Sequence, residues 1–234
     1  MRYLIKFTKG QNIKFVSHLD LMRTLQKIIM RSELNINYSQ GFNPHMAMSI
    51  AQPLSVGVSS NGEYMDIVLR EPENPEEILR RLNSKSLPGI EFLEIRGIEN
   101  IPNQKKVPQA MAMVEEAVYT IKIRCADASK VNEELNKLLE LKEWNIIKKN
   151  KKGEEKALNI RSMIKDIKYW VKDEYIIIST RISCGSKEHL NPEFMINFIK
   201  DNTSRTDKEA FVNVIREEMY AHKQEKLLPL YKTV

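Results

Sequence analysis

The chain has 234 residues, a formal net charge of +6, 42% hydrophobic residues and 29% charged residues. This composition is typical of a globular protein and excludes a chain that stays disordered for lack of apolar residues. The length suits one large domain or two domains of roughly 100 residues each. The longest apolar runs, such as residues 175–178, are far shorter than the roughly 20 residues of a membrane-spanning helix, and the first residues lack a signal-peptide core. We therefore expect a soluble cytoplasmic protein with no membrane partner.

The cysteine pattern excludes several kinds of site. Cys125 and Cys184 stand far apart, so the chain has neither a disulfide framework nor a paired CxxC metal knuckle, and we expect both to be small buried side chains. Cys184 and His189 are close in sequence, but two ligands do not make a structural zinc site. The sequence also lacks a GxxxxGK[ST] phosphate loop, a GxGxxG motif and a GxSxG motif. We predict no metal and no cofactor of its own.

The first part of the chain alternates between strand and helix patterns. Tyr3, Ile5 and Phe7 alternate with polar or small neighbours, as in a half-buried strand. Residues 17–32 have apolar side chains at helical spacing after a capping box, which predicts a helix. The further elements that we predict are strands at 36–38, 46–51 and 64–70, a turn at Asn61-Gly62, a helix from Asn74-Pro75 that ends before Pro88-Gly89, and a strand at 91–98.

This order, β, α, β, β, α, β, is that of a ferredoxin-like fold, in which two helices cover one face of an antiparallel sheet. The second half repeats the order, with residues 157–171 ambiguous. Its predicted elements are strands at 117–124, 144–149, 175–183 and 211–216 and helices at 128–141 and 192–201. We therefore predict an α+β protein made of two ferredoxin-like (βαββαβ) halves with antiparallel sheets, a domain at 1–98 and a domain at 116–234 joined by a linker at 99–115.

Basic side chains gather at two places. The helix at 17–32 has Arg23, Lys27 and Arg31 on one side at four-residue spacing, opposite its apolar stripe. This basic ridge is either the solvated side of an amphipathic helix or a surface that contacts phosphates. A second basic group, in a hairpin-like tip, consists of Lys148, Lys149, Lys151 and Lys152 beside Gly153. This tip is either a solvated turn or a contact for RNA phosphates.

The segment YSQGFNPH at residues 38–45 is unusually rich in glycine, proline and amide residues, which force an irregular path. Loops of this kind often carry function. Its aromatic side chains either stack on a base or ring-shaped ligand or anchor the loop to the core. Its amide and imidazole groups suit a shaped pocket. The binding candidates in this segment are Tyr38, Gln40, Phe42, Asn43 and His45.

Two of the four histidines, His18 and His45, lie in this region. His18 and Asp20 point about 200 degrees apart on a helix, so they are not expected to share a metal or a proton. A structural histidine bonded near the helix start is the simpler role for His18. His45 is a candidate for chemistry or binding, because histidine transfers protons readily near neutral pH.

Residues 17–67 resemble the hallmark stretch of the radical-SAM-associated bacterial protein family of unknown function. The second half resembles the family only loosely, through its element order and residues 160–166. The matching residues are Ser17, His18, Asp20 and Arg23 in an SHLD-x-x-R element, Tyr38, Ser39, Gln40, Gly41, Phe42, Asn43, Pro44 and His45 around an SQGFNPH element, and Pro53, Leu54, Gly57, Glu63 and Tyr64 in the part that follows.

Members of that family are similar to a domain found beside, or fused to, a cobalamin-binding radical SAM enzyme, near genes for an RNase E/G-type ribonuclease and ribosomal proteins. The resemblance therefore implies a radical SAM enzyme as partner and RNA or the ribosome as a substrate theme, and it adds Glu63 to the binding candidates. It does not make this chain a radical SAM enzyme, because the CxxxCxxC triad needs three closely spaced thiolates and only two distant cysteines are present.

Three functions remain open at this stage. The chain is a non-catalytic accessory module that presents or binds RNA or a ribosome-related substrate for the radical SAM enzyme. Alternatively, it is an RNA-processing endonuclease that resembles the CRISPR repeat-processing proteins, with His45 or His18 as general base. This alternative is based on an analogy between folds. A third alternative is a purely structural interaction module in which the loop only holds two strands and a helix together.

Overall fold

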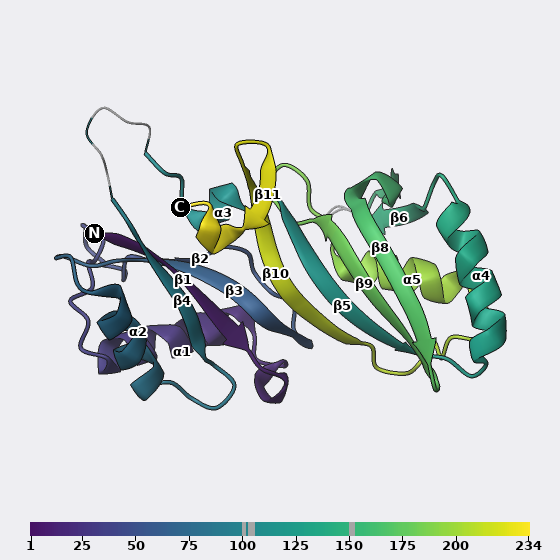
Figure 1. Cartoon of the computed structure of the whole chain (residues 1–234), viewed down its shortest axis with the longest axis horizontal. Coiled ribbons are helices and arrows are strands. Elements are labelled where there is room, and N and C mark those ends of the chain that lie inside the picture. The colour runs from purple at the N-terminus through teal and green to yellow at the C-terminus, as the bar shows by residue number, and fades with distance from the viewer. Residues whose placement is uncertain (100–101, 103–105, 150–152) are drawn as a thin grey trace. The chain divides into compact units, whose positions relative to one another are not determined.

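The computed structural model describes residues 1–99, 102, 106–149 and 153–234 (Figure 1). They form two compact units. Unit 1 comprises Met1–Glu115 and Ile215–Val234, and unit 2 comprises Glu116–Val214. Both units combine antiparallel strands with a few helices, so the predicted α+β class is confirmed. No helix in the described part of the chain is long and apolar enough to cross a membrane.

Unit 1 contains the predicted βαββαβ arrangement in its N-terminal part. Its strands have the order β4-β1-β3, with β2 beside β3, and neighbouring strands are antiparallel. On the same sheet β10 pairs with β3, and β11 pairs with β10. The elements are β1 (Arg2–Lys9), η1 (Gln11–Ile13), α1 (His18–Arg31), β2 (Met48–Ile50), β3 (Val58–Val68), α2 (Pro75–Ser84), β4 (Phe92–Ile98), α3 (Ala110–Met113), β10 (Asn213–Lys223), β11 (Lys226–Pro229) and η3 (Leu230–Lys232).

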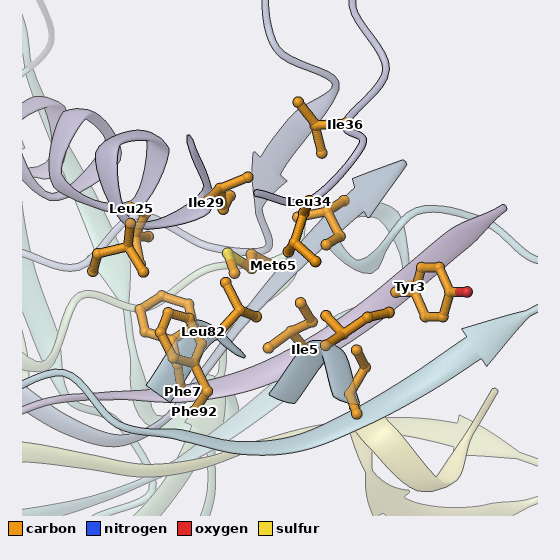
Figure 2. Close-up of a cluster of buried hydrophobic side chains, with 14 of the residues drawn as sticks. Tyr3, Ile5, Phe7, Leu25, Ile29, Leu34, Ile36, Met65, Leu82 and Phe92 are labelled. Atoms are coloured by element: carbon orange, nitrogen blue, oxygen red, sulfur yellow. The ribbon is translucent and has the colours of Figure 1, made fainter. Parts of the chain in front are cut away.

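Helices α1 and α2 pack on one face of this sheet and form the core of unit 1. Figure 2 shows Leu25 and Ile29 of α1 together with Phe7 of β1 and Met65 of β3. The predicted helix at 17–32 is confirmed, because Ser17 is its N-cap and its hydroxyl accepts a hydrogen bond from the backbone N–H of Asp20 at 3.2 Å. The helix predicted from Asn74-Pro75 is confirmed in the same way by α2.

The turn predicted at Asn61-Gly62 is wrong, because both residues lie inside β3. Phe7 pairs with Glu63 but Lys9 pairs with Ser60, so this stretch is an irregularity in the β1–β3 ladder. A Cβ atom on Gly62 would lie 2.6 Å from the carbonyl oxygen of Glu217 on β10. The glycine therefore permits the close approach of a neighbouring strand, which a sequence reading cannot distinguish from a turn signal.

Two short strands predicted next to this region differ from the structure. Residues 36–38 form no strand, and Ile36 and Tyr38 make single bridges with Leu69 and Met46. The strand predicted at 46–51 shortens to β2. The chain here is held by a few backbone bonds to the end of β3 instead of by a regular ladder.

Unit 2 contains the predicted elements β5, α4, β6, β9 and α5 in chain order, and the chain then enters β10. The place that the predicted strand 144–149 was expected to fill in the sheet is taken by β8. Its sheet has the order β5-β9-β8, and a separate hairpin of β6 and β7 follows α4. The ambiguous stretch 157–171 contains the end of β7 and most of β8. The elements are β5 (Glu116–Arg124), α4 (Ala128–Glu140), β6 (Asn145–Lys149), β7 (Glu155–Asn159), η2 (Arg161–Met163), β8 (Ile164–Lys172), β9 (Tyr175–Ser183) and α5 (Pro192–Asp201).

The core of unit 2 contains the stacked rings of Trp144 and Phe198, whose centroids are 4.8 Å apart. Cys125 and Cys184 are both buried and free, which confirms the expected role as small buried side chains. Of the basic tip, Lys151 and Lys152 lie outside the described residues.

The last predicted strand, 211–216, is much longer in the structure, because β10 continues to Lys223. Its charged residues have partners inside unit 1. Lys6 donates to the carboxylate of Glu218 at 2.7 Å, and the hydroxyl of Tyr64 donates to the same carboxylate at 2.7 Å. Residues from Ile215 to the end therefore belong to unit 1, whereas the sequence prediction grouped them with residues 116–214. Of the predicted linker at 99–115, residues 100–101 and 103–105 lie outside the described part, and Ala110–Met113 form α3.

An ion pair between Glu63 and Arg216 is buried in unit 1, and both side chains are only 1% exposed. The Nε of Arg216 donates to Glu63 Oε1 at 2.7 Å, and one Nη donates to the backbone carbonyl of Gln52 at 2.9 Å. Lys9 is also buried, and its ammonium donates to the carbonyls of Lys14 and Val16, both at 2.9 Å. We call Lys9, Glu63 and Arg216 the buried charge cluster.

Removing one side of this pair should destabilise unit 1 strongly. We expect Arg216→Met to lower the free energy of unfolding by roughly 3–5 kcal/mol, because it leaves a buried carboxylate without its partner. The double variant Glu63→Met with Arg216→Met should be more stable than Arg216→Met alone. Urea denaturation followed by circular dichroism measures both effects.

The matched control is Arg80→Met, which breaks the exposed pair with Glu77 on α2. An exposed pair contributes little, so its unfolding midpoint should stay close to that of the wild type. Equal midpoints for Arg216→Met and Arg80→Met would contradict the role assigned to the buried pair.

Candidate functional site

Residues 38–46 form an irregular hairpin whose base is fixed to the sheet of unit 1. The backbone N–H of Ser39 donates to the carbonyl of His45 at 2.8 Å, and the N–H of His45 donates to the hydroxyl of Ser39 at 2.8 Å. Below this closure, Asn37 donates to Val68 at the end of β3 at 2.7 Å, and Val68 donates to Ala47 at 3.0 Å. The 38–46 hairpin therefore has a fixed base and a tip that projects from it.

The side chains at the tip are exposed. Gln40, Asn43 and His45 are exposed, and Phe42 has 111% of its reference accessibility. Tyr38, at the base, is 38% exposed. An apolar ring fully in water gains nothing from folding, so packing does not explain Phe42. The segment singled out from the sequence thus presents an aromatic ring and several hydrogen-bonding groups to solvent.

A hollow of about 290 Å³ lies at the base of this hairpin. Its wall combines the hairpin, β2, the end of β3 and the start of α3. This volume lies at the lower end of the range for small-molecule sites. The lining residues are Asn37, Tyr38, Ser39, His45, Met46, Ala47, Met48, Ser49, Asp66, Val68 and Gln109.

Asp66 is the charged residue of this wall, and its side chain is almost fully buried. Burial raises the pKa of its carboxyl, although the N–H of Ala110 donates to Oδ2 at 2.7 Å and the Nε of Arg2 lies 3.5 Å from Oδ1. Arg2 also donates to the carbonyls of Val107 and Pro108, at 2.7 and 2.9 Å. The pair of Arg2 and Asp66 therefore holds the segment that leads into α3 against the hollow. Sequence reasoning missed Asp66, and its one local signal is a carboxylate between the apolar residues of β3.

The basic ridge of α1 is exposed, but part of its charge is already matched, because Arg23 donates to Asp20 at 3.1 Å. A hydrogen bond from the Ser17 hydroxyl and this contact with Arg23 lower the pKa of the Asp20 carboxyl. Lys27 and Arg31 are exposed. Within the described part of the chain, no hydrogen bond or ion pair joins the ridge to the 38–46 hairpin.

The two histidine candidates are not brought into one constellation. His18 is the first residue of α1 and is half-buried, whereas His45 is exposed on the hairpin. Glu63 lies away from the surface, since its carboxylate is buried against Arg216, and it is not accessible to a ligand. Over residues 1–99, 102, 106–149 and 153–234, no three His, Cys, Asp or Glu side chains are grouped as metal ligands would be.

Comparisons with known proteins give one family match. The profile of a family described as "Uncharacterized protein conserved in bacteria (DUF2344)" matches residues 2–192. No curated protein matches the chain. Among solved structures, the chain is similar to one from "Crystal Structure of a Cbf5-Nop10-Gar1 Complex", with 9% identity and a TM-score of 0.48. That similarity covers 93% of this chain and 48% of the other, so the chain spans about half the length of that structure. A second similar structure is an unknown protein from Galdieria sulphuraria, with 11% identity and a TM-score of 0.25 over 92% of this chain and 96% of the other.

The raised pKa of Asp66 predicts an unusual pH dependence of stability. A carboxyl with a higher pKa in the folded state binds its proton more tightly there than in the unfolded chain, whose value is about 3.9. Its contribution to stability is therefore greatest at acid pH and is lost as the pH rises through the folded pKa. Asp66→Asn keeps the acceptor for Ala110 and serves as a reference in which all other carboxylates are unchanged.

We expect the unfolding free energy of the wild type, relative to that of Asp66→Asn, to increase as the pH falls from about 8 to about 4. Urea denaturation across this range measures the difference. A difference that is constant, or that grows toward alkaline pH, would show that burial does not dominate the environment of Asp66.

Proposed function

The chain belongs to the DUF2344 family of uncharacterized proteins conserved in bacteria, and we propose that it is a non-catalytic accessory module that binds RNA through the 38–46 hairpin. The observation that carries this proposal is the full exposure of Phe42 beside the exposed side chains of Gln40, Asn43 and His45. Unpaired bases are recognised by stacking on aromatic rings and by hydrogen bonds to their edges, and the hairpin tip offers both.

The hollow at the base of the hairpin supports the same function. Tyr38 and the backbone-linked pair of Ser39 and His45 lie on its wall, with Met46 and Met48 as apolar neighbours. A base that leaves its stack can enter such a hollow and remain in contact with the hairpin. The mixed apolar and polar wall suits a flat heterocycle better than it suits a bare phosphate.

Positive charge on unit 1 supplies the electrostatic part of the proposal. Lys27 and Arg31 are exposed on α1, and the whole chain has a net charge of +6. Contacts between lysine or arginine and phosphates release counterions, so binding of RNA by this route weakens as salt rises. Arg23 contributes less, because it shares its charge with Asp20.

We further propose that a cobalamin-binding radical SAM enzyme is the partner of this module. The support is the resemblance of residues 17–67, which include α1, the 38–46 hairpin and most of β3. In this arrangement the partner supplies the cluster chemistry, and this chain supplies contact with an RNA or ribosome-related substrate. Co-purification of the tagged full-length chain from a bacterial extract, with and without ribonuclease, tests the partner and shows whether RNA bridges the two proteins.

Phe42→Ala should weaken RNA binding without affecting the fold. We expect roughly 5- to 150-fold weaker binding of single-stranded RNA, because one stacked base contributes about 1–3 kcal/mol. Asn43→Ala should weaken binding as well, through the loss of an edge contact. Fluorescence anisotropy with labelled RNA at low and high salt measures both variants.

The matched control is Phe15→Ala, which removes another exposed phenylalanine of unit 1 that lies outside the hairpin. Equal affinity for wild type, Phe42→Ala and Phe15→Ala would argue that the hairpin does not contact RNA. RNA fragments that form with the wild type and disappear with His45→Ala would instead identify an endonuclease. If the hairpin variants lower thermal stability and leave the affinity for RNA and for the partner protein unchanged, the hairpin is a structural element only.

A further inference from the structure

The sheet of unit 2 has one face that its helices do not cover. Strands β5 and β9 alternate regularly between buried and partly exposed side chains. The buried side faces the helices, as shown by the hydroxyl of Tyr169, which donates to Asn132 at 2.8 Å and to Asn136 at 2.7 Å on α4. In Figure 1, α4 and α5 lie behind and beside the strands of this unit. We call the other side the open face of unit 2.

The strand register places the side chains of the open face in rows. Directly paired residues of an antiparallel sheet project to the same side, so the pairings of β5 with β9 and of β9 with β8 define the rows. Three consecutive rows are Thr120, Ser179 and Lys168, then Lys122, Ile177 and Trp170, then Arg124, Tyr175 and Lys172.

Two aromatic rings lie on diagonal positions of these rows. Trp170 on β8 is 48% exposed, and Tyr175 begins β9. The ammonium of Lys122 lies 3.8 Å from the centroid of the Tyr175 ring. Tyr175 is partly exposed. A lysine over such a ring contributes less than a stacked base does, so a base can displace it and leave the ammonium free for a phosphate. Diagonal neighbours on a sheet lie about 7–8 Å apart, within reach of successive nucleotides of an extended strand.

The charge around the two rings is positive. Lys122, Lys168 and Lys172 form no ion pair with any other described residue. Arg124 is matched by Glu174 at 3.1 Å and lies 4.0 Å from Asp207. Glu116 and Asp166 lie toward the other end of the face, where Arg181 pairs with Glu116 at 3.1 Å. The three lysines beside the aromatic rings are therefore the groups that are complementary to a phosphate backbone.

We propose that the open face of unit 2 binds single-stranded RNA, with bases stacked on Trp170 and Tyr175 and phosphates contacted by Lys122, Lys168 and Lys172. Sheets that bind single-stranded RNA use the same combination of exposed aromatic side chains and flanking basic residues. This inference rests on the proposed function, because both take RNA as the ligand. Its residues belong to unit 2, whereas the 38–46 hairpin belongs to unit 1.

The tryptophan content of the chain allows a direct test. Of the two tryptophans, Trp144 is fully buried and Trp170 is exposed. Titration of the full-length protein with a single-stranded RNA oligonucleotide should quench tryptophan emission, since a base stacks on Trp170. Trp170→Phe should keep the affinity within about threefold and lose the quenching, whereas Trp170→Ala should bind about tenfold more weakly. Duplex RNA of the same sequence should bind more weakly than the single strand, because its bases are not free to stack.

Ile147→Ala is the matched control, because Ile147 is an exposed apolar residue of the β6–β7 hairpin in the same unit. Its affinity should equal that of the wild type. Binding of single-stranded RNA without quenching, and with equal affinity for Trp170→Ala, would overturn the inference while leaving the role of Phe42 intact. Loss of affinity in Trp170→Ala together with normal affinity in Phe42→Ala would support it and would reject the hairpin as the RNA contact. Absence of any binding at low salt would overturn it as well.

Discussion

The buried ion pair between Glu63 and Arg216 is the constraint on which the architecture of unit 1 depends. It joins two residues that are 153 positions apart in the sequence. Taking both charges out of water costs several kcal/mol per ion, which is offset only when the geometry is good and the remaining donors are satisfied. Arg216 meets this condition through Glu63 and the carbonyl of Gln52. Lys9 lies in the same cluster, and its burial lowers the pKa of its ammonium while the charge of Glu63 raises it.

This cluster links the end of the chain to the strand that carries the candidate site. β10 reaches β3 at the irregular stretch around Gly62, where Ser60 donates to the carbonyl of Arg216 at 2.9 Å. β10 pairs with that part of β3. The final residues of β3 pair instead with β2 and form hydrogen bonds with the base of the 38–46 hairpin. Asp66 lies between these two regions and faces the hollow. One strand thus contains part of the buried charge cluster and also holds the base of the 38–46 hairpin.

The sequence predicts well those elements whose signals are local. The capped helices α1, α2 and α5 lie within one or two residues of their predicted bounds, because a cap residue and an apolar stripe are properties of one segment. The turn predicted at Asn61-Gly62 is wrong, and β10 is longer than predicted and lies mostly in the other unit, for the opposite reason. The role of Gly62 depends on the close approach of Glu217, which is far away in the sequence. Arg216 on β10 is neutralised by Glu63, which is equally distant in the sequence. The exposure of the hairpin residues could be anticipated from glycine, proline and amide content, whereas Asp66 gains its surroundings only when Arg2 and Ala110 fold against it.

The distribution of charge matters more for the proposed ligand than its total. Phosphates are screened from protein charges beyond about 8–10 Å at ordinary salt, so a net charge of +6 spread over 234 residues attracts RNA only weakly. On the open face of unit 2, lysines without an ion pair among the described residues lie beside aromatic rings and act within that distance. The two proposed surfaces present their rings differently, since one is an irregular hairpin tip around Phe42 and the other is a regular sheet face around Trp170. On a hairpin tip the backbone path positions the ring, whereas on a sheet the alternation of residues does so. In both proposals the rings select unpaired nucleotides by stacking, so only a modest excess of positive charge is required to retain them.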